Sequence, residues 1–130
     1  MNVFVGSRVL EIDPIKKEIV WQYTGEDSDR AIWTFHSSFI SSARRLPNGN
    51  TLICEGMDGR LFQVTPKGAI VWEYVNPHFG RLSLGGRQVL FNLVYRAQPV
   101  PYDWVPPGTP RSESPVVAPD VTTFRVPTTQ

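Results

Sequence analysis

Two histidines are the side chains of this 130-residue chain best suited to acid–base or nucleophilic chemistry. His36 is followed by Ser37 and Ser38, which places a general base beside two hydroxyl groups in the sequence. Catalysis of this kind needs the histidine within hydrogen-bond reach of a nucleophile and a third group that orients the ring. His36 is therefore a candidate catalytic residue, and the alternative is an ordinary loop histidine. His78 is expected to be a loop residue with backbone or water partners.

A pair of adjacent arginines offers a second kind of chemistry, the binding of an anion. Arg44 and Arg45 fall in an expected strand, 39–46, where successive side chains point to opposite faces of the sheet. If this strand is the innermost of its sheet, one of the two guanidinium groups could line an anion-attracting channel. The alternative is an ion pair with Glu55 or Asp58 at the end of the sheet.

Composition excludes several other classes of function. A net charge of +1, with 19% charged residues, gives no electrostatic footprint for nucleic acid. No apolar run approaches the roughly 20 residues that span a bilayer, and the start of the chain does not read as a secretory signal. The expected location is therefore the cytoplasm, without a membrane span.

Metal and cofactor sites are not expected either. The chain has one cysteine, Cys54, which cannot form an intrachain disulfide or a cysteine-rich zinc site. Its place in Thr51–Glu55 predicts a small buried strand residue. No phosphate-binding glycine loop, zinc spacing or calcium loop is present.

Turn signals divide residues 39–75 into four short apolar runs. Asn48-Gly49 and Asp58-Gly59 supply the positive φ angles of tight hairpins between twisted strands, and Pro66-Lys67-Gly68 marks a third reversal. These turns predict one complete four-stranded antiparallel sheet. Its strands are expected near 39–46, 51–55, 60–65 and 69–75.

Residues 1–24 carry a partial copy of this unit. Arg8–Pro14 aligns with Arg60–Pro66, and Glu18–Tyr23 aligns with Ala69–Tyr74 after a one-residue difference in the turn. A spacing of about 51 residues is in the range of β-propeller blades, each of which is one small sheet. Val3–Gly6 would then be the second strand of a first blade that lacks its innermost strand.

Trp21 and Trp72 occupy equivalent positions in the two copies. This equivalence favours packing between neighbouring sheets, with the ring filling the wedge and its indole N–H donating to a backbone acceptor. Stacking on a ligand is the alternative. Residues 25–38 between the copies are expected to connect the outer edge of one sheet to the inner edge of the next.

The last third of the chain changes character twice. Residues 78–87 are punctuated by glycine and predict a loop, and residues 88–97 predict a strand that has no hairpin partner. Residues 98–130 hold 8 of the 12 prolines and predict an extended tail that lies along a surface or binds a protein partner. The expected organisation is a β domain over 1–97 and the tail over 98–130.

Several of these motifs resemble the arylsulfotransferase family and the wider group of quinoprotein-like β-propellers. The matching residues are Leu46–Ile53, Ile12-Asp13-Pro14, the two Ile-Val-Trp-x-Tyr strands, and the run from Tyr95 to Pro106. The resemblance implies four-stranded antiparallel blades, about six in a full ring, and sulfuryl transfer by a histidine nucleophile in the central channel. It also implies a histidine five residues before Leu46, where this chain has Ser41, with Ser42 at a neighbouring position that is often acidic.

The sequence therefore predicts an all-β chain with one complete blade, one incomplete blade and one extra strand. Strand 88–97 of one copy would complete the first sheet of the next in a homo-oligomeric ring, with a trimer favoured over a tetramer. A monomeric β-sandwich is the competing fold.

Three functions stay open at this point. The first is a non-enzymatic binding or assembly module. The second is a sulfotransferase-type enzyme acting on aryl sulfates through His36 or His78, and the third is a propeller remnant that is stable only in a larger assembly. The family resemblance also leaves an exported location open.

Overall fold

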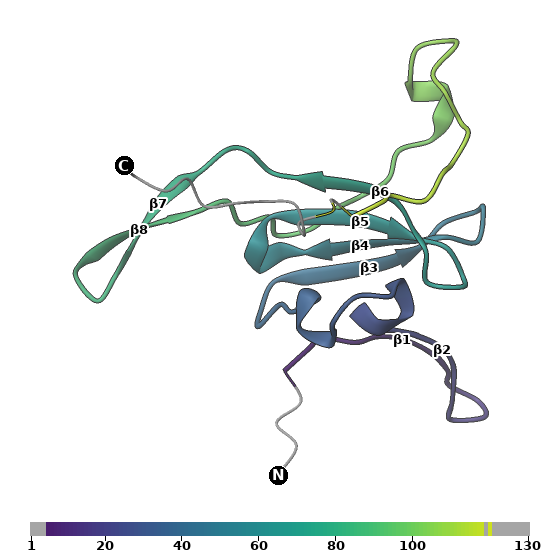
Figure 1. Cartoon of the computed structure of the whole chain (residues 1–130), viewed down its shortest axis with the longest axis horizontal. Helices are drawn as coiled ribbons and strands as arrows, with labels where there is room; N and C mark the ends of the chain where they lie inside the picture. The colour runs from purple at the N-terminus through teal and green to yellow at the C-terminus, as the bar shows by residue number, and fades with distance from the viewer. Residues whose placement is uncertain (1–4, 119, 121–130) are drawn as a thin grey trace.

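The computed structural model of the chain describes residues 5–118 and 120, and these residues form mainly β structure (Figure 1). Their strands are arranged in three antiparallel sheets of two, four and two strands. The described residues form no closed propeller. The all-β prediction is confirmed at this level.

The four-stranded sheet is the centre of the molecule, and its strands follow one another in chain order. The predicted hairpins are present, because Gly49 has φ +89° and Gly59 has φ +63°, which a glycine adopts without strain. The prediction of four strands divided by these turns is confirmed. The strands are β3 (Ser41–Arg45), β4 (Thr51–Glu55), β5 (Arg60–Val64) and β6 (Ile70–Val75).

The central sheet has two unlike faces. One face, here called the core face, carries the paired residues Ala43, Ile53, Phe62 and Glu73. The opposite face, here called the open face, carries the paired residues Ser42, Cys54, Leu61 and Tyr74, and one pair further along it carries Trp72. The buried apolar cluster lies on the core face and consists of Tyr23, Phe35, Ile53, Phe62, Val64 and Ile70.

A two-stranded hairpin packs on the core face. It consists of β1 (Val9–Asp13) and β2 (Glu18–Tyr23). Tyr23 lies at the centre of the contact, with its ring centroid 5.6 Å from that of Phe35 and 5.8 Å from that of Phe62. The expected strand Val3–Gly6 falls partly outside the described residues, and its described part, Val5 and Gly6, is not a strand.

Residues between this hairpin and the central sheet form two short 3-10 helices, η1 (Gly25–Ser28) and η2 (Ile32–Thr34). Ser28 Oγ donates to the carbonyl oxygen of Gly68, at the turn between β5 and β6, across 2.5 Å. The connection is therefore fastened to the central sheet.

The prediction for residues 78–97 is wrong in part, because residues 88–91 do form a strand but it ends at Phe91 and has a hairpin partner. A third sheet stands where a loop and a lone strand were expected, because β7 (Gly80–Leu84) pairs with β8 (Arg87–Phe91). Gly85 and Gly86 have φ +55° and +79°. Consecutive residues with positive φ make the two-residue hairpin turn that fits the strand twist.

This third hairpin projects away from the rest of the molecule (Figure 1). Its residues are exposed throughout except Phe91, which is half-buried. Asn76 and Asn92 hold its base closed, since each side-chain amide donates to the carbonyl oxygen of the other residue across 3.0 Å. The hairpin is thus an arm with a fixed base and no packed face in the described chain.

Residues 92–97 are not a strand but cross part of the open face. The Val94 N–H donates to the Gly56 carbonyl oxygen across 2.9 Å, and the Ala97 N–H donates to Ser42 Oγ across 3.4 Å. These contacts cover the β3–β4 side of the open face.

The described part of the tail also contacts the central sheet. It contains one 3-10 turn, η4 (Tyr102–Trp104). The Val116 N–H donates to the Ile70 carbonyl oxygen across 2.7 Å, and the Val116 side chain packs against the buried cluster. Residues 119 and 121–130 of the predicted tail lie outside the described residues.

Candidate functional site

Neither histidine is part of a nucleophile–base pair in the described chain. His36 is exposed, and its backbone N–H donates to Glu55 Oε1 across 2.6 Å. The Ser37 hydroxyl donates to the Phe39 carbonyl oxygen, not to a ring nitrogen. His78 donates from its backbone N–H to the Asn76 side chain across 3.1 Å. Among the described residues, no hydrogen bond joins either imidazole to a hydroxyl group.

The two arginines of β3 have different roles. Arg44 is exposed on the open face, where it pairs with Leu52. Arg45 forms an ion pair with Glu11, and its guanidinium carbon lies 4.4 Å from the centroid of the Trp21 ring. Arg45 therefore joins β3 to the first hairpin, and this role competes with binding an anion. The expected alternative partner Glu55 pairs with Arg60 instead.

Ser41 and Ser42 lie on opposite faces of β3. Ser41 is exposed and donates to the neighbouring carbonyl oxygen of Ile40 across 2.7 Å. Ser42 accepts a hydrogen bond from the Ala97 N–H, so its hydroxyl helps to hold the segment on the open face. Burial raises the pKa of the nearby Cys54 thiol, which donates to the Val94 carbonyl oxygen. A thiol with a raised pKa is a poor nucleophile at neutral pH.

The predicted turn residues serve the fold. Asn48 accepts the Asn50 N–H across 3.1 Å and donates from its side-chain amide to Glu113 across 2.9 Å, which joins the tail to the β3–β4 turn. Gly59 is close to the Asn92 carbonyl oxygen, and a Cβ at this position would overlap it. Asp58 accepts from the Asn92 side-chain amide through its backbone carbonyl oxygen.

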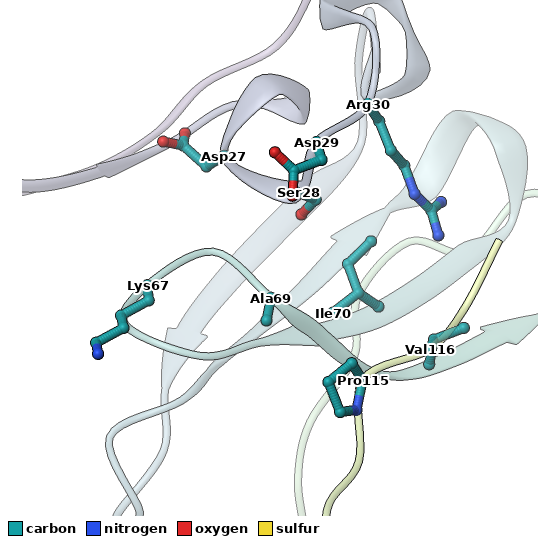
Figure 2. A pocket seen from close by; sticks show the side chains of 9 residues that line it. All are labelled: Asp27, Ser28, Asp29, Arg30, Lys67, Ala69, Ile70, Pro115 and Val116. Atoms are coloured by element: carbon teal, nitrogen blue, oxygen red, sulfur yellow. The ribbon is translucent and has the colours of Figure 1, made fainter.

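A pocket of about 250 Å³ opens between the connection, the β5–β6 turn and the tail (Figure 2). Figure 2 shows Arg30 and Lys67 at opposite ends of it in this view. Its hydroxyl group, on Ser28, is already hydrogen-bonded to Gly68 and to the Tyr23 hydroxyl, and the Arg30 guanidinium lies 3.6 Å from Glu73. Ser28 and Arg30 are thus engaged in contacts within the fold.

A buried charged cluster was not anticipated from the sequence. Arg60 donates to Glu55 across 2.9 Å, to Glu73 across 2.5 Å and to the Thr34 carbonyl oxygen across 3.2 Å. It links β4, β5, β6 and the connection. A signal was available, because Glu55 and Arg60 flank one tight turn and form a direct cross-strand pair.

The two repeated tryptophans have nearly identical local geometry but different surroundings. Trp21 stacks on Tyr23 with centroids 6.4 Å apart and an interplanar angle of 12°, and Trp72 stacks on Tyr74 at 6.3 Å and 12°. The Trp21 indole N–H donates to the Pro66 carbonyl oxygen across 3.0 Å. Tyr23 is 1% exposed, whereas Tyr74 is 42% exposed, because no sheet of the described chain covers the second pair.

The phenol of Tyr23 offers a test of the contact between the first hairpin and the connection. Burial raises its pKa above the ordinary 10.0, and its hydroxyl lies 2.8 Å from Ser28 Oγ. Tyr23→Phe is expected to cost about 1 kcal/mol of unfolding free energy through the lost hydrogen bond.

The difference between wild type and Tyr23→Phe should also depend on pH. A raised folded-state pKa means that the folded protein holds this proton more tightly than the unfolded chain, so the tyrosine's contribution is present below about pH 10 and is lost as pH rises through the folded pKa. Urea unfolding of both proteins from pH 7 to 11 measures this. Parallel pH profiles would contradict the buried-phenol assignment.

No protein-family model, curated protein or solved structure matches the chain. No helix in the described ranges is long and apolar enough to cross a membrane. Within the same ranges, histidine, cysteine, aspartate and glutamate side chains form no group of three or more that could hold a metal ion. The features that remain as a candidate functional surface are the two-stranded sheets and the exposed aromatic pair on the open face.

Proposed function

We propose that this protein is a non-enzymatic binding and assembly module, an arylsulfotransferase-like propeller fragment whose incomplete sheets are completed by other copies of the same chain. The observation that carries this proposal is the pattern of two, four and two strands. An isolated two-stranded hairpin is marginally stable in water, and its outer strands leave backbone groups unpaired. The chain carries one such hairpin before the central sheet and one after it.

Two copies can make one full sheet from these halves. If β8 of one copy pairs antiparallel with β1 of the next, the strand order becomes β7-β8-β1-β2. This order corresponds to β3-β4-β5-β6 of the central sheet. The proposal replaces the expected single strand 88–97 with a hairpin that contributes two strands.

Two features of the first hairpin support its equivalence to the β5–β6 half of a blade. A register shift interrupts the β1–β2 ladder between Glu11 and Ile12, and another interrupts the β5–β6 ladder between Gln63 and Val64. These positions coincide in the sequence alignment of the two copies. The stacked Trp–Tyr pairs coincide as well.

Each copy would then supply two blades. Three copies would close a ring of about six blades, the number that the family resemblance implies. A head-to-tail contact closes into a ring when its rotation permits, and closure covers the exposed strand edges.

The position of Ser41 favours binding over catalysis. The resemblance implies a histidine there, and neither His36 nor His78 hydrogen-bonds a hydroxyl group in the described chain. The module would therefore offer a surface or a channel to a partner and would not transfer a sulfuryl group.

The mass of the full chain in solution tests this proposal. One chain has a mass of 14.7 kDa, and light scattering behind size-exclusion chromatography is expected to give about three times that value. A monomer at every concentration would overturn the proposal.

A hairpin-deleted variant sharpens the test. Residues 78–91 are replaced by a short Gly/Ser linker, which the Asn76–Asn92 hydrogen bonds should tolerate. This variant should still unfold cooperatively when followed by circular dichroism but be monomeric. Assembly that persists without the hairpin would show that β8 is not the joining edge.

A further inference from the structure

The contact between β1–β2 and the central sheet shows how one stacked Trp–Tyr pair is received. Trp21 and Tyr23 of the hairpin pack against the core face, where Phe62, Val64 and Ile70 are at most 4% exposed. The contact is therefore formed between an aromatic pair on one sheet and three apolar residues on the next. The chain contains a second aromatic pair and a second set of apolar residues of the same kind, and both are exposed.

The second aromatic pair is Trp72 and Tyr74, here called the leading surface. Trp72 is 44% exposed, and the segment 92–97 covers only the β3–β4 side of the open face. Within the described residues, the aromatic pair on the β5–β6 side of the open face is therefore exposed and available for a contact.

The second set of receiving residues lies on the outer side of β1–β2. In the alignment of the two copies, Leu10, Ile12 and Ile19 correspond to Phe62, Val64 and Ile70. They are between 36% and 56% exposed, and Leu10 points away from the central sheet because its neighbours Val9 and Glu11 share the face of Tyr23 and Trp21. These three residues are here called the receiving surface.

We infer that the leading surface of one copy binds the receiving surface of a second copy, with Trp72 and Tyr74 in the places that Trp21 and Tyr23 take within the chain. This inference rests on the proposed function and adds the faces that meet. The hairpin that supplies β1 also supplies the receiving surface.

The ladder partners of the two surfaces are uncharged. The neighbours of the leading surface across the β5–β6 ladder are Leu61 and Gln63, and the partner of Leu10 across the β1–β2 ladder is Gln22. None of these residues carries a charge that would be desolvated. Burial of unpaired charges would be the main cost in such an interface, and these ladder partners do not add to it.

The test uses one variant for each surface of the full chain. Trp72→Glu removes the leading surface, and Ile19→Glu removes the receiving surface. In a head-to-tail contact, each variant alone should be monomeric at concentrations where wild type assembles. An equimolar mixture should form a complex of about twice the mass of one chain and stop there, because one intact surface of each kind remains.

Matched controls place the same charge on exposed residues outside both surfaces. Trp33→Glu and Ile15→Glu should assemble as wild type does, because both side chains are exposed and belong to neither surface. Circular dichroism melting checks that all four variants fold. If either Glu variant does not fold, Trp72→Ala and Ile19→Ala replace them, and each should weaken association at least about tenfold on dilution.

The outcomes separate this inference from the proposed function. A monomeric wild type overturns both. An assembled wild type whose surface variants also assemble, or whose variant mixture stays monomeric, overturns the pairing of these surfaces and leaves self-assembly through another contact.

Discussion

Arg60→Met is expected to lower the free energy of unfolding by about 3–5 kcal/mol, the usual result of removing one partner of a buried ion pair. The Glu55 side chain is 3% exposed, and Arg60 is its ion-pair partner in the structure. Without Arg60, Glu55 must either keep a buried charge or take up a proton. Urea unfolding at pH 7 measures the loss.

Two further variants show whether the unpaired Glu55 carboxylate causes the loss of stability. Arg44→Met removes an exposed arginine from β3 of the same sheet and should change stability by no more than about 0.5 kcal/mol. Glu55→Gln on the Arg60→Met background should recover part of the loss, because a neutral amide can still accept the His36 N–H at less cost. A double variant as unstable as Arg60→Met alone would contradict this account.

Phe62→Ala is expected to cost about 3–5 kcal/mol as well, by a different mechanism. The Phe62 side chain is fully buried. Its ring centroid lies 5.8 Å from that of Tyr23, and 5.6 Å from that of Phe35 in an edge-on arrangement. The substitution removes aromatic surface and leaves a cavity between the central sheet and the first hairpin. Ile15→Ala, at an exposed turn residue, is the control and should be nearly neutral.

Hydrogen exchange can show which part of the fold Phe62→Ala destabilises. Because Phe62 lies under the first hairpin, amide hydrogen exchange in β1 and β2 should accelerate more than exchange in β4. Uniform acceleration across both sheets would indicate that the hairpin and the central sheet unfold as one unit and not in sequence.

The central sheet could be predicted because its signals are local. Asn48-Gly49 and Asp58-Gly59 fix the positions of two hairpins, and the alternation of side chains assigned Arg44 and Arg45 to opposite faces. The partner of Arg45 could not be predicted. Glu11 is 34 residues away, and only the packing of the first hairpin on the core face brings it near.

The third hairpin was missed although its signal was also local. Gly85-Gly86 between two runs of suitable length is a two-residue hairpin turn, but Gly80 and the polar residues around it resemble a loop. The exposed side chains of β7 show the reason. The hairpin has no buried face in the described chain, so its sequence carries no stretch of core residues comparable to that of β4.

The sequence by itself determined the turns, the four central strands and the two copies of the Trp–Tyr pair, because these depend on residues close together in the chain. Tertiary structure alone decided that Tyr23 is buried while Tyr74 is open, since burial depends on which sheet covers each pair. It also decided that Glu55 accepts the His36 N–H, a contact that requires the connection to fold back over the end of β4. Local turn chemistry thus set the strands, and long-range packing set which of their faces remain open.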